Sequence, residues 1–184
     1  MVGRRAAVLG HPIAHSLSPR LHRAAYAALG LDGWRYDAVD VTEESLPAFV
    51  AGLTDEWAGL SLTMPLKQTV LPLLDHVEPL AGVVGAVNTV LVQGGGARPV
   101  LTGTNTDVYG IVGALAEALG PQALSGAQPV RTAAVLGAGA TAASTLAALA
   151  QLGCASPVVY VRSMARIGPL ARAAHRMGVE PAYR

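Results

Sequence analysis

The chain has 184 residues, of which 52% are hydrophobic and 14% charged, and its formal net charge is +1 at pH 7. This composition excludes a disordered tail, because disorder requires low hydrophobicity and high charge. The near-neutral charge argues against nucleic acid as a partner, since binding to a phosphate backbone draws on concentrated positive charge. The length allows one large domain or two small ones.

Lysine is nearly absent from the chain: of the 13 basic residues, only Lys67 is a lysine. Arginine stays protonated in proteins, whereas lysine can lose its proton when its surroundings favour the neutral form. Lys67 is therefore a candidate for proton transfer, although chance alone also explains the count.

The single cysteine, Cys154, cannot form an internal disulfide, and the apolar stretch before Pro12 is too short for a signal peptide. We therefore expect a cytoplasmic protein. Residues 132–161 are a stretch of 30 without Lys, Arg, Asp, Glu or His, long enough to cross a bilayer. Their Ala and Gly content and the glycine turn at 137–139 instead favour buried strand, turn, helix and strand, so no membrane partner is expected.

The first hundred residues alternate strand-like runs with helix-like stretches, which predicts βαβ units and an α/β fold. We expect Ser18 to cap a helix with Pro19 in its first turn, and Glu43 and Glu44 to occupy the first turn of another. A further helix begins at Pro65. The expected strands cover 5–10, 34–41, 57–62, 88–93 and 99–102, the last two forming a hairpin around the glycines at 94–96.

A helix over 107–119 is expected to end at Gly120-Pro121, and the loop 122–129 is a natural boundary. Behind it, the patterns predict strands over 131–136 and 158–162 and helices over 141–152 and 164–177. We therefore divide the chain into a domain at 1–103, a linking helix and hinge at 104–129, and a second domain at 130–184. The first 103 residues carry a net charge of −2 and the rest +3, so the second domain suits an anionic ligand.

A glycine pattern, Gly137-x-Gly139-x-x-Ala142, stands between an apolar strand and a helix, which is the order of a dinucleotide-binding turn. The first glycine allows the tight turn, the second lets a pyrophosphate approach the backbone at the helix N-terminus, and the small alanine allows close packing of helix on strand. A purely structural turn has the same pattern. The residues expected to contact the cofactor are Gly137, Ala138, Gly139, Ala140 and Thr141.

The residues after the second strand of this unit favour NADP over NAD. NAD-binding units carry an acidic residue there for the ribose 2′-hydroxyl. This chain instead has Arg162, Ser163 and Arg166. Two guanidinium groups and a hydroxyl suit a 2′-phosphate, although arginines at a solvated helix start are also common.

Ser16 and Ser18 lie on either side of an expected helix start, where two hydroxyls and the first backbone amides converge on a site suited to a carboxylate. Ser18 can also serve as a simple cap, whereas no capping role is expected for Ser16. His11 and His15 do not predict a metal site, because Pro12 breaks any helix that would align them and no acidic or cysteine partner is nearby.

Four segments carry a joint pattern: GHPIAHSLSP at 10–19, GLSLTMPLK at 59–67, GAVNT at 85–89 and GTNTD at 103–107. In this order, and together with the glycine turn and the Arg-Ser-x-x-Arg cluster, they resemble shikimate dehydrogenase. The resemblance spans almost the whole chain. It implies an α/β substrate domain followed by a Rossmann-like NADP-binding domain, incomplete here.

The resemblance also implies roles for individual residues. Ser16 and Ser18 would bind the substrate carboxylate, and Thr63 and Asn88 the ring hydroxyls. Lys67 and Asp107 would be the catalytic pair that handles the proton during NADPH-dependent reduction of 3-dehydroshikimate to shikimate. The position of Lys67 just inside the helix expected to begin at Pro65 favours the same role. The positive end of the helix dipole disfavours a cation there and so favours loss of the lysine proton.

The chain departs from that family in two places. Ser61 stands where the family commonly has Asn, so the side chain reaches less far and one contact to a substrate hydroxyl is shortened or handed to water. The family continues well beyond Arg184, and only two strands are expected in the second domain, which would leave an unpaired sheet edge. We therefore expect either a fragment or a fold completed by another chain, as monomer or homodimer. A relative acting on quinate or aminoshikimate, and a truncated shikimate-binding module without turnover, remain as alternatives.

Overall fold

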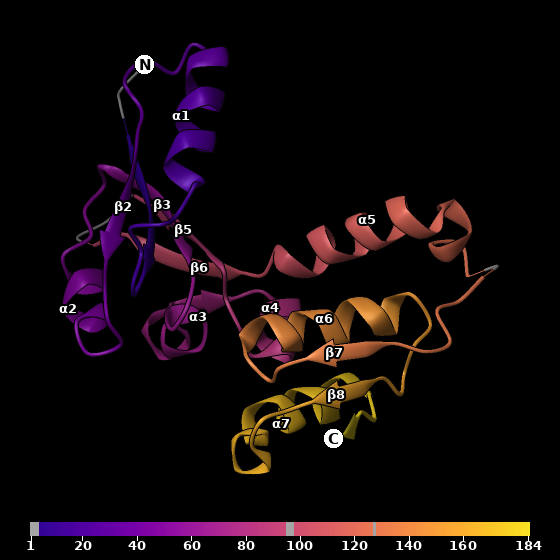
Figure 1. Ribbon diagram of the computed structural model, residues 1–184. Coiled ribbons are helices and arrows are strands. Elements are labelled where there is room, and N and C mark those ends of the chain that lie inside the picture. The colour runs from indigo at the N-terminus through magenta and orange to yellow at the C-terminus, as the bar shows by residue number, and fades with distance from the viewer. Residues whose placement is uncertain (1–3, 95–97, 127) are drawn as a thin grey trace. The chain divides into compact units, whose positions relative to one another are not determined.

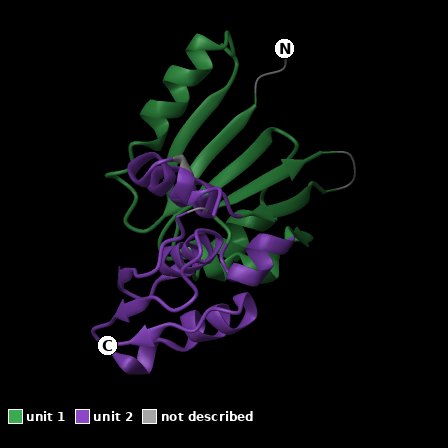
Figure 2. Ribbon diagram, turned by 90° about the vertical axis from the view of Figure 1, so that its right-hand side faces the viewer, with its two compact units in different colours: residues 1–78, 87–104 green, residues 79–86, 105–184 purple. Residues whose placement is uncertain are grey.

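The computed structural model describes residues 4–94, 98–126 and 128–184 (Figure 1). The chain divides into two compact units, one made of Met1–Glu78 and Val87–Thr104, the other of Pro79–Ala86 and Asn105–Arg184 (Figure 2). Residues 79–86 thus belong to the second unit although they interrupt the first in sequence, and the helix expected as a separate linker lies within the second unit.

A six-stranded mixed sheet forms the first unit, in the order β2-β1-β3-β5-β6-β4. Its strands are β1 (Arg5–Gly10), β2 (Arg35–Asp40), β3 (Trp57–Leu62), β4 (His76–Val77), β5 (Thr89–Gln93) and β6 (Val100–Thr104). β1 pairs in parallel with β2 and β3, whereas β5 runs antiparallel to both its neighbours. The hairpin of β5 and β6 agrees with the expected one, and its glycines 95 and 96 lie outside the described residues.

Parallel strands need crossover connections, and the helices of the first unit supply them. They are α1 (Ser18–Ala28), α2 (Leu46–Ala51), α3 (Leu66–Thr69) and the 3₁₀ turn η1 (Leu71–Leu73). β1 is the centre of the βαβ arrangement, and five of its six residues are buried. This explains why its sequence is a continuous apolar run rather than an alternating one.

The second unit contains a three-stranded parallel sheet in the order β7-β8-β9. Its elements are α4 (Pro79–Val84), α5 (Asp107–Leu119), η2 (Pro121–Ala123), β7 (Ala134–Leu136), α6 (Ala140–Gln151), β8 (Val158–Tyr160), η3 (Met164–Arg166), α7 (Gly168–Met177) and β9 (Ala182–Tyr183). Strands that alternate with helices in this order form consecutive βαβ units, as expected for the beginning of a Rossmann-like domain.

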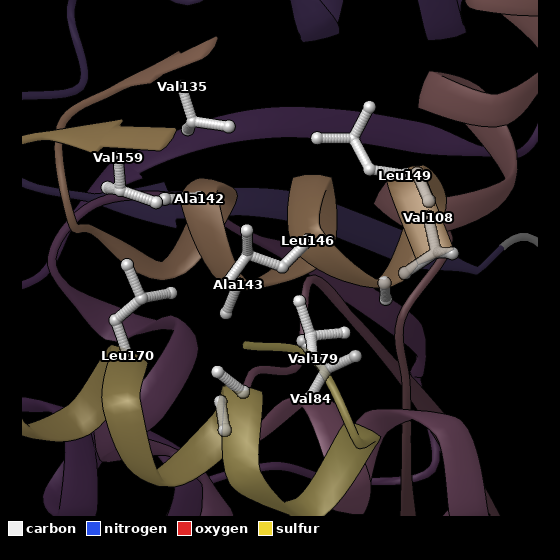
Figure 3. Packing of buried hydrophobic residues seen from close by; sticks show 14 of the residues in the cluster. Val84, Val108, Val135, Ala142, Ala143, Leu146, Leu149, Val159, Leu170 and Val179 are labelled. Atoms are coloured by element: carbon white, nitrogen blue, oxygen red, sulfur yellow. The ribbon is translucent and has the colours of Figure 1, made fainter. Parts of the chain in front are cut away.

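The core of the second unit forms around α6. Figure 3 shows Ala142, Ala143 and Leu146 of this helix. On one side of them lies Val159 of β8, and on the other side lies Leu170 of α7. Ala142 is 7% exposed, so the small third residue of the glycine pattern does pack within the core. Among the described residues, no helix is long and apolar enough to cross a membrane, and the stretch 132–161 folds as β7, α6 and β8.

Several elements differ from the sequence predictions at their ends. α2 begins at Leu46, so Glu43 and Glu44 lie before the helix rather than in its first turn. In the turn before α2, the Thr42 amide donates to Ser45 Oγ and the Ser45 amide donates to Thr42 Oγ1. The helix expected over 164–177 is split into η3 and α7. The prediction of only two strands in the second unit was wrong, because β9 pairs with β8.

Candidate active site

The start of α1 places two hydroxyls beside each other. Ser16 Oγ accepts a hydrogen bond from the Ser18 backbone amide at 3.3 Å. Leu17 is the N-cap residue, and no side chain makes the standard cap bond. The expected roles are therefore exchanged: Ser18 does not cap the helix, and Ser16 holds the first turn. The chain brings the two serines together as a pair of polar groups at this helix start.

Sequence reasoning missed Tyr36, a residue of β2 that contacts Ser61 of β3. Its phenol donates a hydrogen bond to Ser61 Oγ at 2.7 Å. The His22 ring stacks on the Tyr36 ring at 3.8 Å between centroids. Burial raises the pKa of Tyr36, and the hydrogen bonds with Ser61 and Ser18 offset this only in part. No local sequence signal marks Tyr36, because the contact depends on the strand order.

Thr63, Lys67 and Asn88 lie around the carboxyl end of β3, and backbone hydrogen bonds hold their segments together. The Leu62 amide donates to the Asn88 carbonyl at 2.7 Å, and the Val87 amide donates to the Lys67 carbonyl at 2.8 Å. All three site residues are partly exposed. Their side chains therefore come from one small region of the first unit that ligands can reach.

Two further contacts shape this region. A Cβ on Gly10 would collide with Cγ2 of Thr63, so glycine is required where β1 ends. The Thr89 hydroxyl donates to Asn88 Oδ1 at 3.0 Å, which orients the amide. An amide fixed through its oxygen presents its NH₂ group as a hydrogen-bond donor.

The helix-dipole argument for Lys67 does not hold in the structure. α3 is only four residues long, so Lys67 lies in its last turn as well as its first. A single turn has too small a dipole to act on the ammonium in the way a longer helix would. The placement of Lys67 beside Thr63 and Asn88 is what remains in favour of a chemical role.

Asp107 is the first residue of α5 and belongs to the second unit. Just before it, Asn105 is only 1% exposed and accepts a hydrogen bond from the Val108 amide through Oδ1 at 3.3 Å. Its Nδ2 donates to the Ala86 carbonyl at 2.9 Å and to Ser144 Oγ at 3.1 Å. Asn105 thus anchors the start of the helix that presents Asp107. The pairing of Asp107 with Lys67 across the two units stays a prediction.

The glycine turn of the second unit has the conformation that its residues suggest. Gly137 has φ +99°, a region that favours glycine, and Gly139 is the N-cap of α6. A Cβ built on either glycine meets no atom within 4 Å, so the backbone is open on those sides. Ala138, Ala140 and Thr141 complete the turn and the first residues of α6. This backbone is accessible to a phosphate group at the start of a twelve-residue helix.

Arg162, Ser163 and Arg166 are at least partly exposed and follow β8. β7 and β8 are parallel neighbours in which Leu136 pairs with Tyr160, and the Gly137 amide donates to the Tyr160 carbonyl at 2.8 Å. The glycine turn and the arginine cluster therefore emerge from the same end of the sheet. This is the geometry in which one ligand can meet both.

Within the described ranges, no group of three or more His, Cys, Asp or Glu side chains is arranged to hold a metal ion. His11 instead pairs with Asp40, with Nδ1 2.6 Å from the carboxylate oxygen, at an exposed position.

Comparison with known proteins gives a consistent result. The profile of the shikimate dehydrogenase substrate binding domain matches residues 8–90. The shikimate dehydrogenase (NADP(+)) of Geobacter sp. (strain M21) is 44% identical over 162 residues, which cover 88% of this chain and 52% of the relative. The shikimate dehydrogenase (NADP(+)) of Thermus thermophilus is 43% identical over 150 residues, which cover 81% of this chain and 52% of the relative. The chain thus spans about half the length of the curated relatives it matches.

Solved structures extend the likeness into the second unit. Shikimate dehydrogenase of Mycobacterium tuberculosis has 36% sequence identity and a TM-score of 0.80, covering 98% of this chain and 63% of that one. Shikimate 5-dehydrogenase of Thermus thermophilus, in complex with NADP(H) and shikimate, has 38% identity and a TM-score of 0.76, covering 97% and 62%. With this substrate-domain match, this fold and these relatives, the chain belongs to the shikimate dehydrogenase family.

Proposed function

We propose that this chain carries the substrate site and part of the coenzyme site of an NADP-dependent dehydrogenase that interconverts 3-dehydroshikimate and shikimate. The observation that carries the proposal is the gathering of Thr63, Lys67 and Asn88 at one end of the first unit's sheet through the Leu62–Asn88 and Val87–Lys67 backbone hydrogen bonds. A proton donor flanked by a hydroxyl and an oriented amide suits a polyhydroxylated ring with a carbonyl group.

The substrate's charged end needs a different set of contacts. Ser16 and Ser18 lie together at the start of α1, where hydroxyls and backbone amides suit a carboxylate. Ser61 supplies a further hydroxyl from β3. We assign the carboxylate to Ser16 and Ser18 and the ring hydroxyls to Ser61, Thr63 and Asn88.

The reaction needs a hydride and a proton. NADPH, when bound, supplies the hydride to carbon C3 of 3-dehydroshikimate, which becomes the carbon of a secondary alcohol. The Lys67 ammonium gives a proton to the oxygen on C3. The carbonyl group thereby becomes an alcohol, and NADPH becomes NADP⁺. In the oxidative direction the neutral Lys67 amine removes that proton. Asp107 is assigned, by the family resemblance, as the other member of the catalytic pair.

The second unit fits NADP. The open backbone at Gly137 and Gly139 would hold the pyrophosphate, and Arg162, Ser163 and Arg166 would hold the 2′-phosphate. Accessible guanidinium groups beside the turn favour NADP over NAD. The single buried cysteine, Cys154, favours the reducing cytoplasm as the compartment.

Calorimetric titration of the 184-residue chain with shikimate and with NADP tests the proposal. Binding of both ligands is the expected result, with weaker binding of NAD than of NADP. A folded chain that binds no shikimate at millimolar concentration would overturn it. The matched control is the Ser16→Ala, Ser18→Ala double variant, in which shikimate binding should weaken while NADP binding stays unchanged.

A steady-state assay with shikimate and NADP tests the reaction itself. Turnover supports the dehydrogenase, and binding of shikimate without turnover counts against it.

A further inference from the structure

A hydroxyl from each of two strands of the first unit meets at Ser61. Tyr36 lies on β2 and Ser61 on β3. The Tyr36 phenol donates a hydrogen bond to Ser61 Oγ at 2.7 Å. Ser61 is one of the residues assigned to the substrate, whereas Tyr36 is only 2% exposed and offers a ligand almost no surface of its own.

The strand order explains how Tyr36 reaches Ser61. β1 lies between β2 and β3, and Tyr36 pairs with Ala6, which in turn pairs with Gly59. Neighbouring strands lie about 4.8 Å apart, so the phenol must extend over β1 to reach β3. Ala6 presents only a methyl group on that face and Gly59 no side chain, which leaves room for the ring. Ser61 lies two residues beyond Gly59 and therefore on the same face.

His22 fixes the ring from the helix side. Its imidazole stacks on the Tyr36 ring with an interplanar angle of 11°, and its Nδ1 lies 2.9 Å from the Ser18 carbonyl oxygen. Tyr36 is thus held by a stacked ring from α1 and by the small residues beneath it. A phenol held in this way has little rotational freedom, and the Ser61 hydroxyl that it contacts shares that restriction.

The direction of the hydrogen bond determines what Ser61 can offer to a ligand. Tyr36 donates to Ser61 Oγ, so the Ser61 hydrogen remains available to another acceptor. Burial raises the pKa of Tyr36 above its ordinary value of 10.0, so the phenol is a protonated donor at neutral pH. The bond therefore persists under the conditions in which the site would work.

We infer that Tyr36 is a positioning residue of the substrate site, whose phenol orients the hydroxyl of Ser61 toward the bound ring acid. This inference rests on the proposed function. It assigns part of the site's selectivity for its substrate to a buried residue that the substrate does not touch. Without the phenol oxygen, the Ser61 hydroxyl would rotate more freely and would have to be ordered when the ligand binds.

Tyr36→Phe is the direct test, because it keeps the ring and its stacking on His22 and removes only the hydroxyl. Loss of one such hydrogen bond should raise the dissociation constant for shikimate about three- to tenfold, measured by calorimetry on the 184-residue chain. Binding of NADP, whose proposed contacts all lie in the second unit, should stay unchanged. Tyr26→Phe is the matched control, since Tyr26 packs against the same hydrophobic cluster as Tyr36, and shikimate binding should not change.

A double-mutant cycle separates positioning from packing. If Tyr36 acts through Ser61, its effect on shikimate binding should shrink at least by half in a Ser61→Ala background. Equal effects in both backgrounds, or unchanged shikimate binding in Tyr36→Phe, would overturn the inference while the wild-type chain still binds shikimate. If the wild-type chain itself binds no shikimate, the proposed function fails instead.

Discussion

Asn105 and Ser144 form a buried hydrogen bond, 3.1 Å from Nδ2 to Oγ, that joins the segment before α5 to the middle of α6. Both side chains are buried, at 1% and 0% exposure. Asn105 also donates a hydrogen bond to the Ala86 carbonyl and accepts one from the Val108 amide. One side chain therefore connects three segments of the second unit and defines where α5 begins.

Asn105→Ala should destabilise the second unit by about 2–4 kcal/mol, because it leaves several buried polar groups without their partner. Urea denaturation followed by circular dichroism measures the change. Thr145→Ala is the control on the same helix, since the Thr145 hydroxyl bonds to its own helix at the Thr141 carbonyl, and its effect should stay within about 0.5 kcal/mol. Equal effects of the two substitutions would contradict the anchoring role.

Acid should weaken the first unit through Asp75. The Arg98 guanidinium, followed by the Leu101 amide, holds the pKa of the Asp75 carboxyl below its usual range. This stabilisation is fully present above the unfolded-state value of about 3.9 and is lost as pH falls through the lower folded-state pKa, because the unfolded chain binds the proton first. Asp75→Asn should be less stable at pH 7 and lose less stability on acidification. Urea midpoints between pH 7 and pH 2 that fall in parallel for both proteins would disprove this.

Alkali should act through the tyrosines. Burial raises the pKa of Tyr36, Tyr26 and Tyr183. Below about pH 10 these phenols are protonated in the folded and the unfolded chain, and above it the unfolded chain ionises first, so stability falls as pH rises. Within the described residues the Tyr183 hydroxyl is buried without a hydrogen-bond partner. Tyr183→Phe should therefore raise the free energy of unfolding by roughly 0.5–1 kcal/mol at pH 7 and reduce its loss above pH 10. A destabilised variant in thermal unfolding would refute the prediction.

Lys67→Arg should abolish turnover and leave shikimate affinity within about an order of magnitude, because arginine keeps the positive charge but cannot act as an acid or base at neutral pH. Steady-state kinetics gives the rate, and calorimetry gives the affinity. Near-native turnover in this variant would remove the acid/base role from Lys67.

Replacing both Arg162 and Arg166 by alanine should weaken NADP binding at least about tenfold and NAD binding little, because the guanidinium groups are assigned to the 2′-phosphate that NAD lacks. Arg131→Ala, which removes another exposed arginine of the second unit, is the control for net charge. Equal losses for the two coenzymes would rule out the assignment.

Local sequence patterns predicted most of the elements. The apolar run at β1, the helix stop at Gly120 and the glycine turn at Gly137 each encode their structure within a few residues, so their positions agree closely with the structure. Ends set by side-chain contacts were less predictable. The exchange of roles between Ser16 and Ser18 is an example, since either hydroxyl can satisfy an amide at a helix start.

The sequence by itself determined the family pattern, the residue types of the candidate site and the order of the βαβ units, because these depend on neighbours along the chain. Only the tertiary structure decided which of those residues meet. The crossing of β1 by Tyr36 toward Ser61, and the third strand β9, depend on strand order and register. Such contacts join residues far apart in the sequence, and no local preference encodes them. The placement of Lys67, the chain's one lysine, beside the segments of Thr63 and Asn88 likewise follows from the tertiary structure.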